Sequence, residues 1–121
     1  MEAITIYGIK TCGSVQKARK YLESKNLSYE FVDWKTAPLD SRFLEWLVGE
    51  IGVEVLLNTK GATYKKLGLK ERTLNPEQKQ QLMLGYPLLI KRPVITYKPS
   101  STSTLRVIVG FDESCLAEVF G

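Results

Sequence analysis

In the first third of the chain, one amphipathic segment lies between two short apolar runs. Residues 3–7 are β-branched and aromatic and stop at Gly8, which predicts a buried strand. Apolar positions within residues 14–26 recur at helical spacing and predict an amphipathic helix. Residues 29–34 are aromatic and β-branched again and predict a second strand. The order strand, helix, strand predicts a βαβ unit.

Helical patterns occupy the middle of the chain. Asp40 or Ser41 can cap a helix whose apolar positions run to residue 51 and which ends at Gly52. Residues 64–69 predict another short helix. Asn75 stands before a proline, which predicts the start of a polar helix that stops near residues 85–87.

The last third of the chain returns to strand patterns. Residues 94–97 and 106–109 are β-type runs, and the Ser/Thr/Pro-rich residues 98–104 between them predict a hairpin loop. The two strands are therefore expected to be antiparallel. Residues 112–120 predict a closing helix with acidic residues in its first turn, a favourable place for negative charge.

This order of elements predicts an α/β protein with a thioredoxin-like fold. We expect a four-stranded mixed sheet flanked by helices, with a helical insertion of about residues 38–87 between the second and third strands. The absence of repeats and linkers in the sequence predicts a single domain over residues 1–121.

Composition narrows the function classes. Of the 121 residues 44% are hydrophobic and 25% charged, with a net charge of +4, as in an ordinary globular protein. We expect no membrane association, since no apolar run approaches the ~20 residues needed to cross a bilayer. The start of the chain lacks the pattern of a secretory signal, so a cytoplasmic location is expected. Direct DNA binding is not expected, because no predicted helix carries a continuous basic stripe with aromatic residues interleaved.

The chain contains two cysteines and no histidine. Without imidazole, Ser-His-Asp and Cys-His hydrolases are excluded, and no metal site is predicted. Two free thiols are expected in a reducing compartment. Cys115 lies within the last predicted helix, where a small buried apolar residue is the simpler interpretation.

Cys12 is the candidate nucleophile. It lies between a strand and the first turn of a helix, where unpaired N–H groups stabilise a thiolate, and Lys10 and Lys17 are close in sequence. The alternative is a half-buried structural cysteine near a turn. Val15 stands where a Cys-x-x-Cys pair would have its second thiol, so Cys12 would need an external thiol such as glutathione, or Cys115.

Basic side chains provide candidate anion contacts. Arg92 precedes Pro93, and such a bond has a raised chance of being cis. The planar fork of Arg92 suits an oxyanion or a glutathione carboxylate, although a solvated cation at a strand end is the alternative. Lys60, Arg92 and Arg106 would form a basic lining if the fold brings them together.

Four stretches in order resemble one family over nearly the whole chain. The sequence is similar to the arsenate reductase (ArsC)/Spx-like family, closest to its YffB-like branch. The matching stretches are residues 7–12 (Tyr-Gly-Ile-Lys-Thr-Cys) with Lys-Ala-Arg at 17–19, residues 56–61 (Leu-Leu-Asn-Thr-Lys-Gly) with Tyr-Lys-Lys-Leu at 64–67, residues 89–93 (Leu-Ile-Lys-Arg-Pro), and residues 109–111 (Val-Gly-Phe).

The resemblance implies roles for these residues. Cys12 matches the catalytic cysteine and Pro93 the family's cis proline. In the glutathione- and glutaredoxin-linked arsenate reductases this thiolate attacks arsenate, glutathione joins the adduct, and three arginines hold the oxyanion. Arg92 falls on the second arginine and Arg106 on the third, whereas Asn58 stands at the place of the first, with Lys60 two positions on.

Three functions follow from the resemblance and the residues together. The favoured one is a glutathione-dependent thiol reductase without a bound cofactor, in which Cys12 reacts and Asn58, Lys60, Arg92, Pro93 and Arg106 bind the anion or glutathione. Its partners would be glutathione or glutaredoxin. The alternatives are an Spx-like transcriptional regulator that binds the RNA polymerase α-subunit, and a glutathione/glutaredoxin-linked arsenate reductase. The substrate, the electron donor and the oligomeric state are not set by the sequence.

Overall fold

The chain forms two compact units in a computed structural model, which describes residues 2–37, 39–99 and 104–120. Residues 1–37 and 92–121 form the sheet unit, and residues 38–91 form the helical unit. The hairpin loop expected at residues 98–104 lies partly outside the described residues.

The sheet unit contains a four-stranded mixed sheet with the order β2-β1-β3-β4. β1 (Glu2–Gly8) pairs in parallel with β2 (Glu30–Asp33) and antiparallel with β3 (Val94–Lys98). β4 (Arg106–Val109) pairs antiparallel with β3. The expected mixed sheet and the expected antiparallel pair are therefore confirmed.

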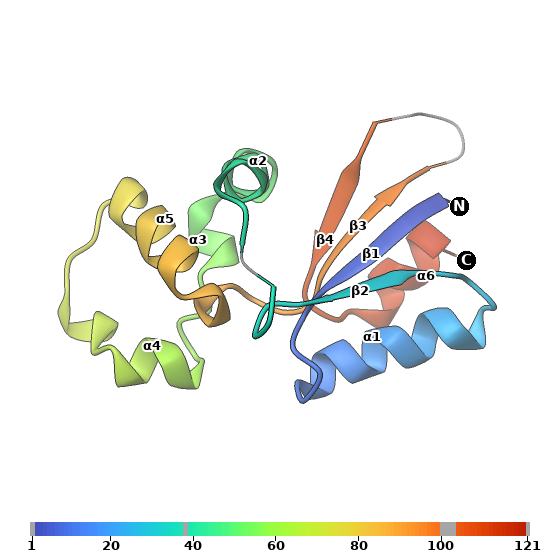
Figure 1. Cartoon of the computed structure of the whole chain (residues 1–121), viewed down its shortest axis with the longest axis horizontal. Coiled ribbons are helices and arrows are strands. Elements are labelled where there is room, and N and C mark those ends of the chain that lie inside the picture. The colour runs from blue at the N-terminus through green and yellow to red at the C-terminus, as the bar shows by residue number, and fades with distance from the viewer. Residues whose placement is uncertain (1, 38, 100–103, 121) are drawn as a thin grey trace. The chain divides into compact units, whose positions relative to one another are not determined.

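Two helices pack on one face of this sheet. α1 (Gly13–Ser24) follows β1, and α6 (Glu113–Phe120) follows β4. Figure 1 shows both helices on the same side of the strands. Alternate residues of β1 and β3 point into the core that the two helices cover, because side chains alternate between the faces of a strand. This core contains Ile4, Ile6, Val15, Ala18, Leu22, Ile95, Tyr97 and Leu116.

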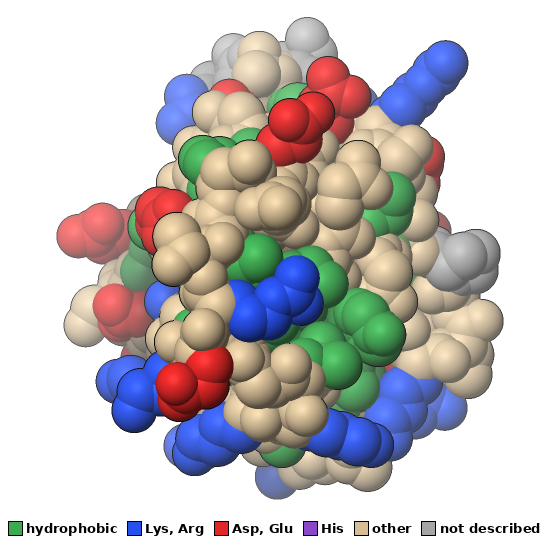
Figure 2. Space-filling model, turned by 90° about the vertical axis from the view of Figure 1, so that its left-hand side faces the viewer, with side chains coloured by type: hydrophobic (Ala, Val, Ile, Leu, Met, Phe, Trp, Pro, Cys, Tyr) green, Lys and Arg blue, Asp and Glu red, His purple; other side chains and the backbone are tan. Residues whose placement is uncertain are grey.

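The helical unit is built from short helices joined by tight turns. In order they are α2 (Ser41–Ile51), α3 (Val53–Leu56), α4 (Ala62–Lys66), the 3-10 turn η1 (Leu69–Glu71), α5 (Pro76–Gly85) and the 3-10 turn η2 (Pro87–Leu89). Its buried apolar residues include Leu44, Leu47, Leu56, Leu69, Met83 and Leu89. Figure 2 looks at the left side of Figure 1, where hydrophobic side chains form a patch with lysine or arginine side chains on it and below it and acidic side chains to its lower left.

Polar caps explain where two of these helices begin. The carboxylate of Asp40 accepts a hydrogen bond from the N–H of Arg42 at 3.2 Å, which confirms Asp40 as the cap of α2. Asn75 and Gln78 form a reciprocal capping box at the start of α5, with bonds of 2.8 and 3.0 Å. The sequence therefore determines these two helix starts locally.

The helix expected at residues 64–69 is the predicted element that differs most from the structure. α4 begins earlier, at Ala62, and ends at Lys66; a separate 3-10 turn follows. Gly68 separates the two elements because its φ of +67° is left-handed, a conformation that ends an α-helix. Within the described residues, no helix has the length and hydrophobicity that spanning a membrane requires.

Candidate functional site

Cys12 is the N-cap residue of α1. Its backbone is extended (φ −75°, ψ 124°), and its carbonyl accepts the first helical hydrogen bond, from the N–H of Gln16 at 3.0 Å. The N–H of Cys12 donates to the carbonyl of Ile9 at 3.2 Å, and the side-chain amide of Gln16 donates to the carbonyl of Lys10 at 2.9 Å. These bonds tie the loop after β1 to the helix and fix the place of the cysteine.

Gly8 gives β1 the space to approach this helix closely. A Cβ atom at position 8 would lie 2.6 Å from Cγ2 of Val15, a separation that real Cβ contacts do not show. The same Cβ would lie 3.7 Å from Cβ of Arg92, so Arg92 stands beside Gly8. A glycine is therefore needed where the strand passes both the first turn of α1 and Arg92.

The pKa of the Cys12 thiol is lowered from its ordinary value. Burial by itself raises this pKa, but the N–H of Val15, the guanidinium of Arg92 and the N–H of Ser14 each stabilise the thiolate and together outweigh burial. The positive charge of Arg92 acts in the same direction. A cysteine at a helix start beside an arginine is the setting in which a thiol becomes nucleophilic.

Arg92 and Pro93 lie in the sheet unit, immediately before β3. The peptide bond between them is cis, as the resemblance implied. Pro93 is buried, and its carbonyl accepts a hydrogen bond at 2.8 Å from the N–H of Gly110, the residue after β4. The structure thus brings together Cys12, Arg92 and Pro93 at the end of the sheet where β1 stops and β3 starts.

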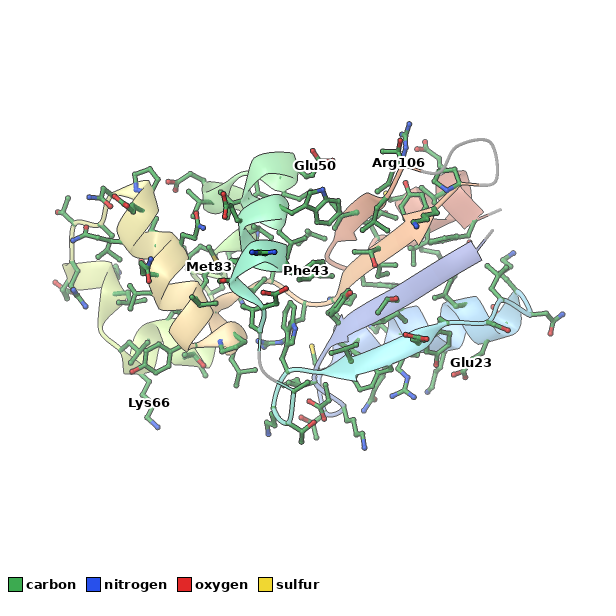
Figure 3. The ribbon with its side chains drawn as sticks, turned by 45° about the horizontal axis from the view of Figure 1, so that its top comes forward. Glu23, Phe43, Glu50, Lys66, Met83 and Arg106 are labelled. Atoms are coloured by element: carbon green, nitrogen blue, oxygen red, sulfur yellow. The ribbon has the colours of Figure 1, made fainter. Side chains whose placement is uncertain are left out.

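Arg106 is not brought to Cys12. It is exposed at the first position of β4, opposite Tyr97, whereas the last residue of β4, Val109, pairs with Val94 next to Pro93. Three residues of strand separate these positions by about 10 Å. Figure 3 shows Arg106 at the far end of the strand. The expectation that Arg106 joins Arg92 in one basic lining has no support in this geometry.

Asn58 and Lys60 belong to a turn of the helical unit. The N–H of Asn58 donates to the carbonyl of Leu89 at 2.7 Å, and its side-chain oxygen accepts from the N–H of Lys60 at 3.2 Å. A Cβ at Gly61 would lie 2.8 Å from the amide nitrogen of Asn58, so the glycine permits this turn. The side chain of Asn58 thus shapes the turn, and Lys60 is exposed on it.

Cys115 is held differently from Cys12. It lies half-buried inside α6, and its N–H donates to a carboxylate oxygen of Asp112 at 3.3 Å. Both cysteines are free thiols. Cys115 lies in the first turn of α6, three residues after Asp112, and does not occupy the cap position that Cys12 has at α1.

Two contributors to the site are not evident from sequence reasoning. In the sequence Val15 stands out as an apolar position of the helix and as the absent second thiol, yet its N–H is the largest stabilising influence on the thiolate and its side chain meets Gly8. From the sequence, Gly8 is predicted only to end a strand. The sequence feature that could have indicated this close contact is a glycine four residues before the cysteine, where a strand gives way to a helix.

The site combines a cysteine at the start of the helix after β1 with Arg92 and its cis bond to Pro93 just before β3. Together with the order of the strands, this arrangement defines a thioredoxin-like protein with a single-cysteine site. The sequence agrees, since the model of the ArsC family matches residues 7–119. The chain belongs to the ArsC family.

Solved structures and a curated relative are similar to the chain over most of its length. The YffB protein is 32% identical, with a TM-score of 0.85 over 98% of this chain and 100% of its own. An arsenate reductase (ArsC) related protein from Brucella melitensis is also 32% identical, with a TM-score of 0.72 over 98% of this chain and 94% of its own. The global transcriptional regulator Spx of Streptococcus agalactiae is 28% identical over 112 residues, which are 91% of this chain and 77% of Spx.

Proposed function

We propose that the protein is a thiol oxidoreductase that uses Cys12 as its single nucleophile and glutathione as its co-substrate. One observation carries the proposal: the pKa of Cys12 is lowered by the N–H of Val15, by Arg92 and by the N–H of Ser14, despite the opposing effect of burial. These groups stabilise the thiolate both before attack and when it is regenerated.

The chemistry balances with glutathione alone. The Cys12 thiolate attacks the glutathione sulfur of a substrate–glutathione mixed disulfide; a Cys12–glutathione disulfide forms, the original disulfide breaks, and the released substrate thiolate takes a proton from water. The thiolate of a free glutathione then attacks the glutathione sulfur on Cys12 and restores the Cys12 thiolate. The net reaction converts the mixed disulfide and one glutathione into substrate thiol and glutathione disulfide.

An external thiol is favoured over an internal one. Val15 occupies the position at which a resolving cysteine would follow Cys12, and Cys115 lies inside α6 with its N–H bonded to Asp112. We propose that Arg92 pairs with a carboxylate of glutathione, because its guanidinium already stands beside the sulfur.

The test begins with the free enzyme and glutathione disulfide. Intact mass should show one added glutathione on the wild type and on Cys115→Ser, and none on Cys12→Ser. Turnover of a glutathionylated peptide should follow the same pattern. Thiol transfer that survives in Cys12→Ser would exclude the proposal.

Two charge variants separate binding from reactivity. Arg92→Gln should raise the KM for glutathione severalfold, whereas Arg106→Gln, at the other end of β4, should leave it unchanged. Arsenate should be included as a substrate. Turnover of arsenate in place of the glutathionylated peptide would favour arsenate reduction, the activity that gives the Brucella melitensis relative its name.

A second candidate function is supported by the Spx relatives, which are named global transcriptional regulators. The protein would then bind the RNA polymerase α-subunit. Since Val15 removes the Cys-x-x-Cys pair, such binding should be independent of the redox state of Cys12. Calorimetry with purified α-subunit tests this: equal affinity for wild type and Cys12→Ser supports the regulator, and absence of binding excludes it.

A further inference from the structure

The helical unit contains a pocket of about 320 Å³ that is separate from the residues of the cysteine site. Thr63, Lys66 and Leu67 line one side of it, and Tyr86, Pro87 and Leu88 line the other. The lining is therefore mostly apolar, with the hydroxyl groups of Thr63 and Tyr86 and the ammonium group of Lys66, the usual make-up of a recognition pocket.

Local backbone geometry forms the pocket. α5 ends at Gly85, Tyr86 has a non-helical backbone (φ −133°, ψ 80°), and Pro87 starts the 3-10 turn η2. On the opposite side, α4 is only five residues long and ends at Leu67. Two chain turns therefore face each other, while Met83 and Leu89 are fully buried nearby in sequence.

The aromatic ring of Tyr86 lies at the surface. Its side chain is 47% exposed, which makes it one of two large hydrophobic residues with this much exposure in the described part of the chain. Exposed tyrosines beside apolar pockets are frequent anchors of protein interfaces. The rim is thus suited to cover an inserted side chain.

Positive charge is concentrated in the segment of the chain that contains one wall of this pocket. Residues 60–72 contain five lysines and arginines and one glutamate, a net charge of +4 that equals the net charge of the whole chain. Lys65, Lys66 and Lys70 are exposed, and they form no ion pair with any residue that the structure describes. Lys79 of the same unit, in contrast, pairs with Glu54 at 2.8 Å. Figure 3 shows Lys66 projecting away from α4.

We propose that this pocket docks an acidic protein segment, which inserts one large apolar side chain between α4 and η2 while its carboxylates pair with Lys66 and the neighbouring lysines. An extended partner fits better than a small ligand, because the unpaired lysines spread along the chain well beyond the pocket lining. It fits better than a nucleic acid, because a phosphate backbone would leave the apolar pocket empty.

Fluorescence anisotropy with defined peptides tests this proposal. The probe is a labelled peptide of about ten Asp and Glu residues with a central Phe, and its matched control has a central Ser. We expect the Phe peptide to bind about tenfold more tightly than the Ser peptide, and Lys66→Glu and Tyr86→Ser each to weaken it by about tenfold. Lys20→Glu makes the same charge change on an exposed helical lysine of the sheet unit and should change binding little.

Amide spectra establish that each variant is folded and locate the peptide. Chemical-shift changes should centre on Thr63, Leu67 and Tyr86. No saturable binding at millimolar peptide overturns the proposal, as does equal binding of the two peptides or an equal loss in Lys20→Glu and Lys66→Glu. Tighter binding of phenylacetate than of the peptide would assign the pocket to a small carboxylate, and displacement of the peptide by duplex DNA would assign it to a nucleic acid.

Discussion

The sheet unit passes from a strand to a helix in a similar way at two places, β1 to α1 and β4 to α6. In each, the residue before the helix accepts the first helical hydrogen bond with its carbonyl: Cys12 from Gln16 at 3.0 Å, and Asp112 from Leu116 at 3.0 Å. One carboxylate oxygen of Asp112 also accepts hydrogen bonds from the N–H groups of Ser114, at 3.0 Å, and Cys115, at 3.3 Å. At Cys12 the corresponding N–H groups belong to Ser14 and Val15 and stabilise the thiolate.

The two helix starts differ in the atom that meets these N–H groups. At α6 a carboxylate oxygen of Asp112 accepts their hydrogen bonds in the folded protein. The sulfur of Cys12 makes no side-chain capping hydrogen bond, and its stabilising interactions are with the ionised form. The protein thus gives up a side-chain cap at α1, and the same N–H groups become available to a reacting thiolate.

Replacing Cys12 with aspartate should have the largest effect on function. We expect Cys12→Asp to lose all thiol transfer, because no nucleophilic sulfur remains, yet to be more stable than Cys12→Ala by about 1 kcal/mol, because a carboxylate caps the helix as Asp112 does. Glutathione transfer and urea unfolding of the two variants measure both quantities. Equal stability of the two variants would show that the two helix starts are not equivalent.

The pH dependence of stability provides the matching control. Since the pKa of Cys12 is lower in the folded protein than in the unfolded one, its contribution is fully present above the unfolded pKa of about 8.5 and is lost as pH falls through the folded pKa. Wild type should therefore gain stability relative to Cys12→Ser as pH rises from neutral towards that value. Cys12→Asp should show no such gain over this range.

The next largest effect is expected where β1 meets α1. Gly8→Ala should destabilise the fold by about 1–3 kcal/mol, because its Cβ would lie 2.6 Å from Val15 and force the strand or the helix to move. Gly13→Ala, at the first residue of α1, is the matched control, since a Cβ there meets nothing within 4 Å. Thermal unfolding compares them, and an equal change in Tm for both would mean that the junction is not tightly packed.

Most of the fold could be predicted from the sequence because its signals are local. The short β-branched and aromatic runs at β1 and β3 and the caps Asp40 and Asn75 depend on a few neighbouring positions, and the structure confirms them. The break at Gly68 was missed because the apolar spacing of residues 64–69 is compatible with one continuous helix, and only a left-handed φ interrupts it.

The site could be predicted only in part, because its geometry is not local. Cys12 was evident from its place between a strand and a helix, whereas Arg106 was assigned to the same anion site as Arg92 by the family resemblance. The register of β4 decides that question, since Val109 and not Arg106 pairs next to Pro93. Val15 stabilises the thiolate of Cys12 through its backbone N–H. Every residue except proline has this group, so the identity of the side chain does not reveal the contact.

A smaller effect is expected at the other helix start. Asp112→Ala should cost about 1 kcal/mol of unfolding free energy, because the N–H groups of Ser114 and Cys115 lose their acceptor. Asp112→Asn, which keeps an acceptor oxygen, should recover most of this loss. Thiol transfer at Cys12 should be unchanged in both variants, and a matching loss of transfer would show that the two helix starts are coupled.

Arg92→Lys should give the smallest effect. Lysine keeps the positive charge but loses the planar guanidinium that interacts with the sulfur, so the pKa of Cys12 should rise towards its ordinary value. Each unit of rise lowers the thiolate fraction about tenfold, while the greater nucleophilicity of a more basic thiolate returns about threefold, so alkylation at neutral pH should slow only a few-fold. Alkylation rates measured against pH in a Cys115→Ser background separate the two influences, because the plateau at high pH should rise while the midpoint moves up. A midpoint that stays in place would mean that the helix N–H groups alone lower the pKa, and the two helix starts would then differ only in the atom that caps them.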